Sequence, residues 1–263
     1  MIIVALLAQV LQASPAPARA NPHDTRVMAR VHRVWDPATG EQLAIAPFQL
    51  NVITWGSRDS VRFEVELRPE SNTRPAPESL AHTDLLVSGR AAIVTGAVAG
   101  PIPVEADFWR VVARENQPFR ESLATFRLAR LGAGAFALSD LIVGVEGKGP
   151  RWLLGADTVA MAPQAMIVAN ERIQLFYQMR SAAPLRDLRT RLIITRVVEN
   201  ESQDDQVLTI AFSTPNVPAG ITAEQRDIDV SRFTGSRYRV DVTVSTATGR
   251  LLGAARGMLE LVR

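Results

Sequence analysis

The chain has 263 residues, of which 47% are hydrophobic, 21% charged and 6% aromatic. This composition is typical of a globular protein, and it excludes a disordered chain, a collagen-like repeat and a small disulfide-stapled scaffold. The sequence contains no cysteine. Thiolate nucleophiles, cysteine-bound zinc and iron–sulfur clusters are therefore excluded as well.

The formal net charge is +2, and Lys148 is the only lysine among the 29 Lys and Arg residues. Proteins that bind nucleic acid usually gather basic residues on one face or along one helix. In this chain the arginines alternate with acids, as in Arg58-Asp59 and in the stretch 186–189. We therefore predict that nucleic acid is not a partner.

The first twenty residues have the pattern of a leader. An apolar stretch from Ile2 to Ala13 is interrupted only by Gln9 and Gln12, and Ala18-Arg19-Ala20 then precedes a polar segment. Small residues after a short apolar core are what signal peptidase cleaves, so we predict a signal peptide over residues 1–20 and an exported protein. A buried first strand or helix is the alternative, because no basic residue precedes Ile2.

The same segment argues against a membrane anchor. A span across a bilayer needs about 20 apolar residues, which is more than this stretch offers. Lipoprotein anchoring requires a cysteine after the leader, and the chain has none. We expect a periplasmic or extracellular protein without a transmembrane anchor.

Beyond the leader, the dominant hydrophobic period is two. From Ser236 to Ser245, apolar residues at every second position alternate with polar ones, and the stretches 61–68 and 173–179 repeat the pattern. Successive side chains of a strand point to opposite faces, so this alternation predicts half-buried β-strands. Weaker candidate strands, rich in residues that favour sheets, are Arg26–Trp35, Thr83–Thr95, Glu105–Arg114, Ser122–Leu131, Ala135–Val145, Arg189–Val198, Val207–Ser213 and Arg250–Val262.

No stretch keeps a helical period with capping residues, so the sequence predicts an all-β protein. Two glycines and a proline in Glu146–Pro150 suggest a boundary, which gives residues 21–147 and 148–263 as two tandem immunoglobulin-like antiparallel sandwiches after the signal peptide of residues 1–20. Each segment is near the ~100 residues of such a domain. A single large β domain is the alternative.

One stretch resembles a known family. Phe136-Ala137-Leu138-Ser139-Asp140-Leu141-Ile142 resembles a Leu-Ser-Asp-Leu strand in the C-terminal part of secreted bacterial GWxTD-domain proteins, and the strands at 173–178 and 238–250 are similar to those that follow it there. The resemblance covers roughly residues 120–263. The Gly-Trp-x-Thr-Asp motif itself is absent. The resemblance implies an exported β-sandwich and supplies no catalytic residue.

Histidine or serine catalysis finds little support. The three histidines are His23, next to the predicted cleavage site, His32, in an alternating strand, and His82. His82 is close to Asp84 in sequence, but the sequence has no Gly-x-Ser-x-Gly elbow to present a nucleophile. We assign no catalytic residue.

Metal and sugar sites are also weakly supported. The acidic stretch Glu199–Asp205, with Asp227 and Asp229 nearby, offers oxygen ligands for calcium but lacks the spacing of a calcium loop. Glu64 and Glu66 could be proposed as a glycosidase pair, yet arginines flank both and predict an ion-paired, solvated surface. We expect the scattered tryptophans to be core residues rather than a sugar platform; they are Trp35, Trp55, Trp109 and Trp152. We assign no metal ligand and no cofactor.

The sequence therefore favours an exported, non-enzymatic binding or structural module of the cell envelope, with an unknown protein or glycan partner. Recognition would come from loops such as 69–82, which holds three prolines, and 199–206. Exposed edge strands would also allow a partner to add a strand. The alternatives are a carbohydrate-binding or calcium-dependent adhesion module, and a hydrolase with an unrecognised carboxylate site.

Overall fold

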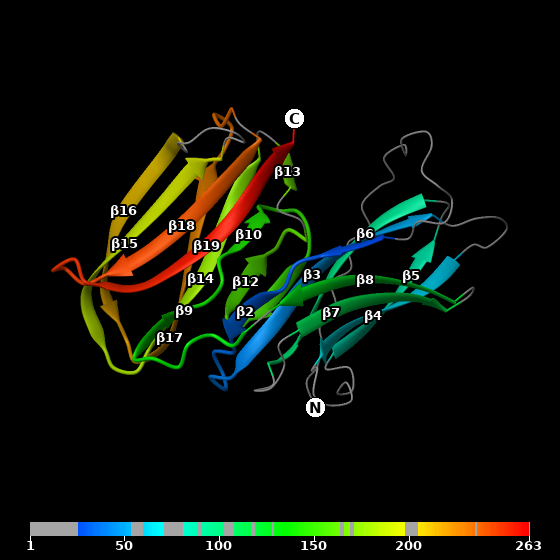
Figure 1. Cartoon of the computed structure of the whole chain (residues 1–263), viewed down its shortest axis with the longest axis horizontal. Helices are drawn as coiled ribbons and strands as arrows, with labels where there is room; N and C mark the ends of the chain where they lie inside the picture. The colour runs from blue at the N-terminus through cyan, green and yellow to red at the C-terminus, as the bar shows by residue number, and fades with distance from the viewer. Residues whose placement is uncertain are drawn as a thin grey trace. The chain divides into compact units, whose positions relative to one another are not determined.

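The computed structural model describes residues 26–53, 60–70, 81–88, 91–102, 108–116, 119–127, 129–163, 166–168, 171–197, 205–234 and 236–262. Nineteen strands and no helix lie in these ranges, so the all-β prediction is confirmed (Figure 1). The predicted leader, residues 1–20, and most of both predicted recognition loops fall outside the described residues.

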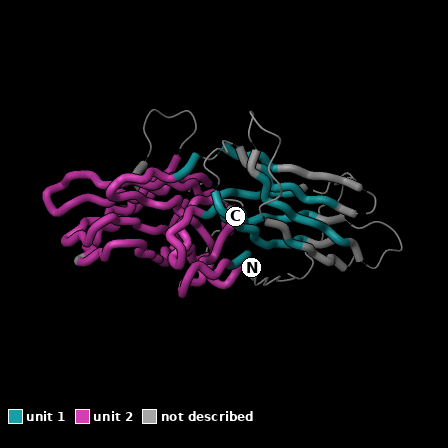
Figure 2. Tube along the Cα trace, turned by 90° about the horizontal axis from the view of Figure 1, so that it is seen from below, with its two compact units in different colours: residues 1–31, 43–130, 149–151 teal, residues 32–42, 131–148, 152–263 magenta. Residues whose placement is uncertain are grey.

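The chain forms two compact units (Figure 2). The first comprises residues 1–31, 43–130 and 149–151, and the second comprises residues 32–42, 131–148 and 152–263. Each unit is therefore assembled from segments that are distant in the sequence. The boundary between residues 147 and 148 concerns which segments fold independently, and it stays a prediction.

Two antiparallel sheets form the first unit. In one, β3 pairs with β1 along one side and with β6 along the other, and in the second the order is β5-β4-β7-β8. The alternation predicted for residues 61–68 is confirmed, because Phe63, Val65 and Leu67 are buried in the core with Phe48. The strands of this unit are β1 (Arg26–Ala29), β3 (Gln42–Ile53), β4 (Ser60–Glu70), β5 (Ala81–Ser88), β6 (Ala91–Pro101), β7 (Phe108–Asn116) and β8 (Phe119–Arg127).

The second unit is also built from two sheets. One has the order β10-β14-β17, with β9 pairing the far end of β14, and the other has the order β13-β19-β18-β15-β16. β11 and β12 form a separate hairpin. The strands are β2 (His32–Trp35), β9 (Phe136–Leu138), β10 (Ile142–Val145), β11 (Arg151–Leu154), β12 (Asp157–Ala160), β13 (Met166–Val168), β14 (Arg172–Ser181), β15 (Leu185–Arg196), β16 (Asp205–Val217), β17 (Gly220–Asp229), β18 (Arg237–Ser245) and β19 (Leu251–Val262).

The core of the second unit lies between its two larger sheets. The apolar positions of β18 (Tyr238, Val240, Val242 and Val244) are all fully buried, which confirms the alternation predicted for residues 236–245. Their partners across the core include every second residue of β14, from Ile173 to Met179. Burial of this apolar surface is the main favourable term in folding.

β14 is buried on both faces. Its outward residues Phe176 and Gln178 are only 1% and 0% exposed. Gln174 on the same face accepts a bond from the backbone of Ala160, at 3.3 Å. The face of this sheet that a two-layer sandwich would leave open is thus covered by other segments of the same unit.

Several details differ from the sequence-based expectations. The strands that were not expected are β3, β11, β12, β13 and β17, and the single strand expected over Thr83–Thr95 is divided between β5 and β6. The turn expected at Pro215–Gly220 shrinks to two residues because β16 continues through Pro215 to Val217. The pairing of β13 with β19 is parallel, although an antiparallel architecture was predicted. Alternation cannot reveal strand direction, because side chains alternate with a period of two in both kinds of ladder.

Candidate functional site

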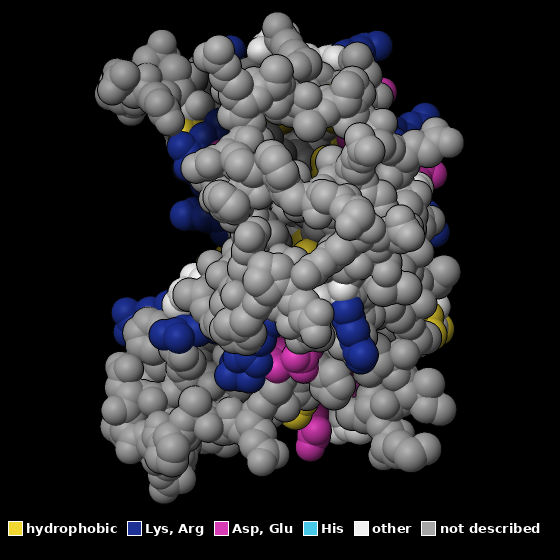
Figure 3. All heavy atoms as spheres, turned by 90° about the vertical axis from the view of Figure 1, so that its right-hand side faces the viewer, with side chains coloured by type: hydrophobic (Ala, Val, Ile, Leu, Met, Phe, Trp, Pro, Cys, Tyr) yellow, Lys and Arg dark blue, Asp and Glu magenta, His cyan; other side chains and the backbone are white. Residues whose placement is uncertain are grey.

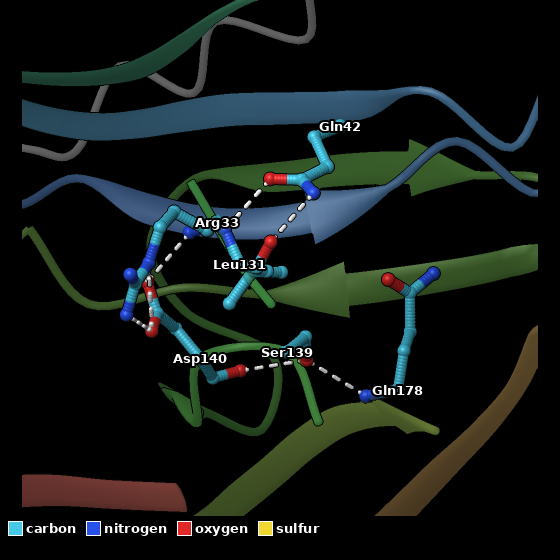
Figure 4. Close-up of polar contacts among 6 residues, drawn as sticks. All are labelled: Arg33, Gln42, Leu131, Ser139, Asp140 and Gln178. Carbon is cyan, nitrogen blue, oxygen red and sulfur yellow. Dashed lines mark hydrogen bonds and ion pairs between the residues drawn. The ribbon is translucent and has the colours of Figure 1, made fainter. Parts of the chain in front are cut away.

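A polar network in the second unit joins three segments: residues 33–42, residues 131–140 and β14 (Figure 4). We call it the hairpin network, because residues 32–42 form a β-hairpin-like turn in which Asp36 accepts a bond from the Gly40 N–H and Gly40 has a positive φ of 74°. Its members are Arg33, Trp35, Gln42, Leu131, Ser139, Asp140 and Gln178.

Arg33 and Asp140 form a two-pronged ion pair. The guanidinium donates to both carboxylate oxygens, at 2.6 Å from Nη2 to Oδ1 and 3.0 Å from Nε to Oδ2. The backbone N–H of Arg33 donates to Oδ2 at 2.7 Å, and the N–H of Asp140 donates back to the Arg33 carbonyl at 3.0 Å. The hydrogen bond to Asp140 raises the pKa of Arg33, against an opposing effect of burial. This geometry is the strong, bidentate form of a charge-assisted hydrogen bond.

The side-chain amide of Gln178 binds both the backbone N–H and the backbone C=O of Trp35, as a neighbouring strand would. Its amide oxygen accepts from the Trp35 N–H at 2.7 Å, and its amide nitrogen donates to the Trp35 carbonyl at 2.9 Å. The backbone N–H of Gln178 donates to the Ser139 hydroxyl at 2.8 Å, and that hydroxyl donates to the Asp140 carbonyl at 2.9 Å. The hydroxyl proton of Ser139 is therefore used inside the network.

Gln42 closes the other end in the same way. Its side chain donates to the Leu131 carbonyl at 3.0 Å and accepts from the Leu131 N–H at 2.8 Å. The amides of Gln42 and Gln178 thus satisfy the backbone groups of Leu131 and Trp35, as buried polar groups usually require. The indole Nε1 of Trp35 is the exception, because it is buried without a hydrogen-bond partner. The arrangement positions the segment 32–42.

The network explains the Leu138-Ser139-Asp140-Leu141 stretch that carries the family resemblance. Leu138 and Leu141 are buried in the core, at 7% and 3% exposure, while Ser139 and Asp140 bind β14 and Arg33. The sequence alone indicates no role for the polar pair Ser139 and Asp140. Their partners are distant in the sequence, so only the fold brings them together.

The glycosidase candidates lie on β4 in the first unit. Glu66 is 4% exposed and receives bonds from Arg68 and from Arg114, the latter at 3.0 Å. It is ion-paired as expected, but buried rather than solvated. The strand register places His82 opposite Glu66 and Asp84 opposite Glu64; the side chains of His82 and Asp84 lie outside the described part.

The phenol of Tyr177 is a polar group buried inside the core of the second unit. Tyr177 is 0% exposed, and its hydroxyl makes no hydrogen bond of ordinary geometry. Burial raises the pKa of this phenol, and the carboxylate of Glu224 raises it further, whereas the Thr190 hydroxyl and Arg226 oppose the rise. A phenol with a raised pKa stays protonated and is a poor base or nucleophile.

Exposed charges pair locally. Asp241 on β18 accepts from Arg239 at 2.8 Å and from Arg256 at 2.6 Å. Burial alone would raise the pKa of Asp241, but the bonds from Arg256 and Arg239 lower it. On the face drawn in Figure 3, basic side chains are likewise spread out, and near its lower edge they lie beside acidic ones. This mixing agrees with the interleaved charges of the sequence.

The other residues considered from the sequence as possible site residues are either buried, exposed or outside the described part of the chain. His32 and Trp35 are buried, at 7% and 0% exposure, so Trp35 is a core residue as expected. Trp152 on β11 is only half-buried, so the same expectation is wrong for it. Asp227 and Asp229 are exposed on β17, where the Asp229 carboxylate accepts from the Ser231 N–H at 2.9 Å. Outside the described residues or side chains lie His23, Trp55, Trp109 and the acidic stretch Glu199–Asp205.

Two kinds of feature are absent from the described residues. In these ranges no three or more of the His, Asp and Glu side chains come together as metal ligands could. The same ranges hold no helix of the length and apolar character that crossing a membrane requires.

The sequence matches no known family model and no curated protein. Solved structures that resemble the chain include the β-glucuronidase 2 of Bacteroides uniformis covalently bound to cyclophellitol-6-carboxylate aziridine, with a TM-score of 0.32, 11% identity and coverage of 82% of this chain. Another is a crystal structure of Bacteroides uniformis β-glucuronidase, with a TM-score of 0.31, 10% identity and 82% coverage. This chain corresponds to only 26% of the length of either structure. A likeness this low carries no argument about function.

Proposed function

We propose that the chain is an exported, non-enzymatic binding or structural module built from tandem immunoglobulin-like β-sandwiches. The hairpin network is the observation that supports this proposal most directly. Its serine, acid and amides are the kinds of group an active site would use, and all of them hold backbone segments in place. The Glu66 carboxylate is similarly bound by two arginines.

Non-enzymatic function is tested by assaying the purified full chain for hydrolysis. The probes are 4-nitrophenyl β-glucuronide, 4-nitrophenyl β-glucoside and 4-nitrophenyl butyrate. We expect wild type, Glu66→Gln and the neighbouring control Glu64→Gln to release nitrophenol no faster than buffer, because the Glu66 carboxylate is sequestered by Arg68 and Arg114. Turnover by wild type that is lost in Glu66→Gln and kept in Glu64→Gln would refute the proposal.

Export is tested by fractionation of a bacterial host and N-terminal sequencing of the chain. We expect the exported form to begin at Asn21, because small residues precede that position and suit signal peptidase. Ala20→Phe should block cleavage, whereas the matched change Ala16→Phe should not. An intact Met1 in a cytoplasmic fraction would contradict the proposal.

A further inference from the structure

The outer face of the larger sheet in the second unit carries two arginines that have no ion-pair partner among the described residues. The core-facing residues of β15 include Leu188, Leu192 and Ile194. Alternation therefore places Arg189 and Arg191 on the opposite face, where both are exposed. β15 lies between β16 and β18 in this sheet (Figure 1). We call this surface the arginine face; it comprises Arg189 and Arg191 with their cross-strand neighbours Ala211, Ser213, Thr243 and Ser245.

No acid within the described part of the chain neutralises these two guanidinium groups. Asp187, two residues before Arg189, forms no ion pair with either arginine. Asp241 on β18 shares this face of the sheet, but it already binds Arg239 and Arg256. The two free arginines lie about 6.6 Å apart along the strand, and their like charges repel each other. An anion bound between them removes that repulsion.

The side chains around the two arginines are small, and most of them carry a hydroxyl. They are Ser213 and Ala211 on β16, and Ser245 and Thr243 on β18. The hydroxyls of Ser245 and Thr243 donate to β15 carbonyls at 3.4 Å, which leaves their oxygens as acceptors. None of these four positions holds an aromatic or large apolar side chain, so the arginine face offers neither a stacking platform nor an apolar anchor.

We infer that the arginine face binds an acidic polysaccharide, a chain of sugars that carries carboxylates. The inference rests on the proposed function and deepens it by naming a glycan as the partner. Guanidinium groups bind carboxylates through paired hydrogen bonds, and the hydroxyl oxygens beside them accept hydrogen bonds from the sugar. A single-stranded nucleic acid fits less well, because its bases are held by stacking on aromatic side chains. A protein partner fits less well too, because the core of a protein interface is apolar.

The test is binding of the full chain to polygalacturonate, measured by isothermal titration calorimetry at low salt. We expect wild type to bind polygalacturonate but not its fully methyl-esterified form, because esterification removes the carboxylate charge and keeps the sugar chain. Arg189→Gln with Arg191→Gln should raise the dissociation constant by at least about tenfold. Both side chains are exposed, so circular dichroism should show an unchanged fold.

Arg172→Gln with Arg232→Gln is the matched control. It removes the same charge from two exposed arginines that lie near Asp229 and outside the arginine face. We expect its dissociation constant to stay within about twofold of wild type. An equal loss in both variants would show a response to net charge alone and would overturn the inference.

Three further outcomes would overturn the inference as well. They are equal binding of the methyl ester, tighter binding of single-stranded DNA than of polygalacturonate, and no binding by wild type. Each of them leaves the proposed function standing, because that proposal is tested separately by the hydrolysis and export experiments.

Discussion

Gly144→Ala is expected to lower the free energy of unfolding by about 3 kcal/mol, a large effect for one added methyl group. A Cβ at this position of β10 would lie 2.2 Å from the carbonyl oxygen of Ala160 and 2.3 Å from its carbonyl carbon. These are backbone atoms, so no side chain can rotate away. The Ala162 N–H also donates to the Val143 carbonyl at 2.9 Å, which holds this segment against β10. Urea unfolding followed by circular dichroism measures the loss.

The control for this prediction is Gly132→Ala. A Cβ there would meet no atom within 4 Å, and Gly132 does not have a positive φ. We expect its free energy of unfolding to stay within about 0.5 kcal/mol of wild type. Equal stability of the two variants would show that the segment at Ala160 can move away from β10 at little cost.

Gln178→Leu is expected to cost about 2–4 kcal/mol, because it leaves the buried N–H and C=O of Trp35 without partners. Leucine keeps most of the side-chain volume, so the loss would report the two hydrogen bonds at 2.7 and 2.9 Å rather than a cavity. Amide hydrogen exchange gives a second readout. The Trp35 amide should exchange faster in the variant, since the hairpin network no longer holds it.

Gln225→Leu on the neighbouring β17 is the matched control, because Gln225 is exposed and its strand register pairs it with Phe176. Its unfolding free energy and the exchange of Trp35 should both stay close to wild type. Unchanged exchange of the Trp35 amide in Gln178→Leu would mean that β14 does not hold the 32–42 segment through this side chain.

Strands with one buried face were predictable. Residues 61–68 and 236–245 alternate between apolar and polar side chains, and β4 and β18 form there with the expected faces buried. β3 was missed because it contains Pro47 and reads as a continuous apolar run rather than an alternation. β17 was missed because a partly exposed edge strand with four charged residues carries almost no period of its own.

The hairpin network was beyond prediction, although one sign of it was visible. Phe176 is apolar at a position that alternation assigns to the outer face, and it is 1% exposed. This pattern indicates that the outer face of β14 is covered, but it does not indicate which segment of the chain covers it. Trp35, whose backbone binds Gln178 on this face of β14, lies 143 positions from Gln178 in the sequence.

The sequence alone determined the all-β class, because the alternation of side chains along a strand is a local property of neighbouring residues. It also determined that no cysteine chemistry occurs and that positive and negative charges are mixed. Only the tertiary structure decided that Ser139, Asp140 and Gln178 hold a distant hairpin. It also decided that β16 lies at the edge of the larger sheet in the second unit. Those outcomes depend on which strands become neighbours, and pairing between distant segments leaves no periodic signal in a single sequence.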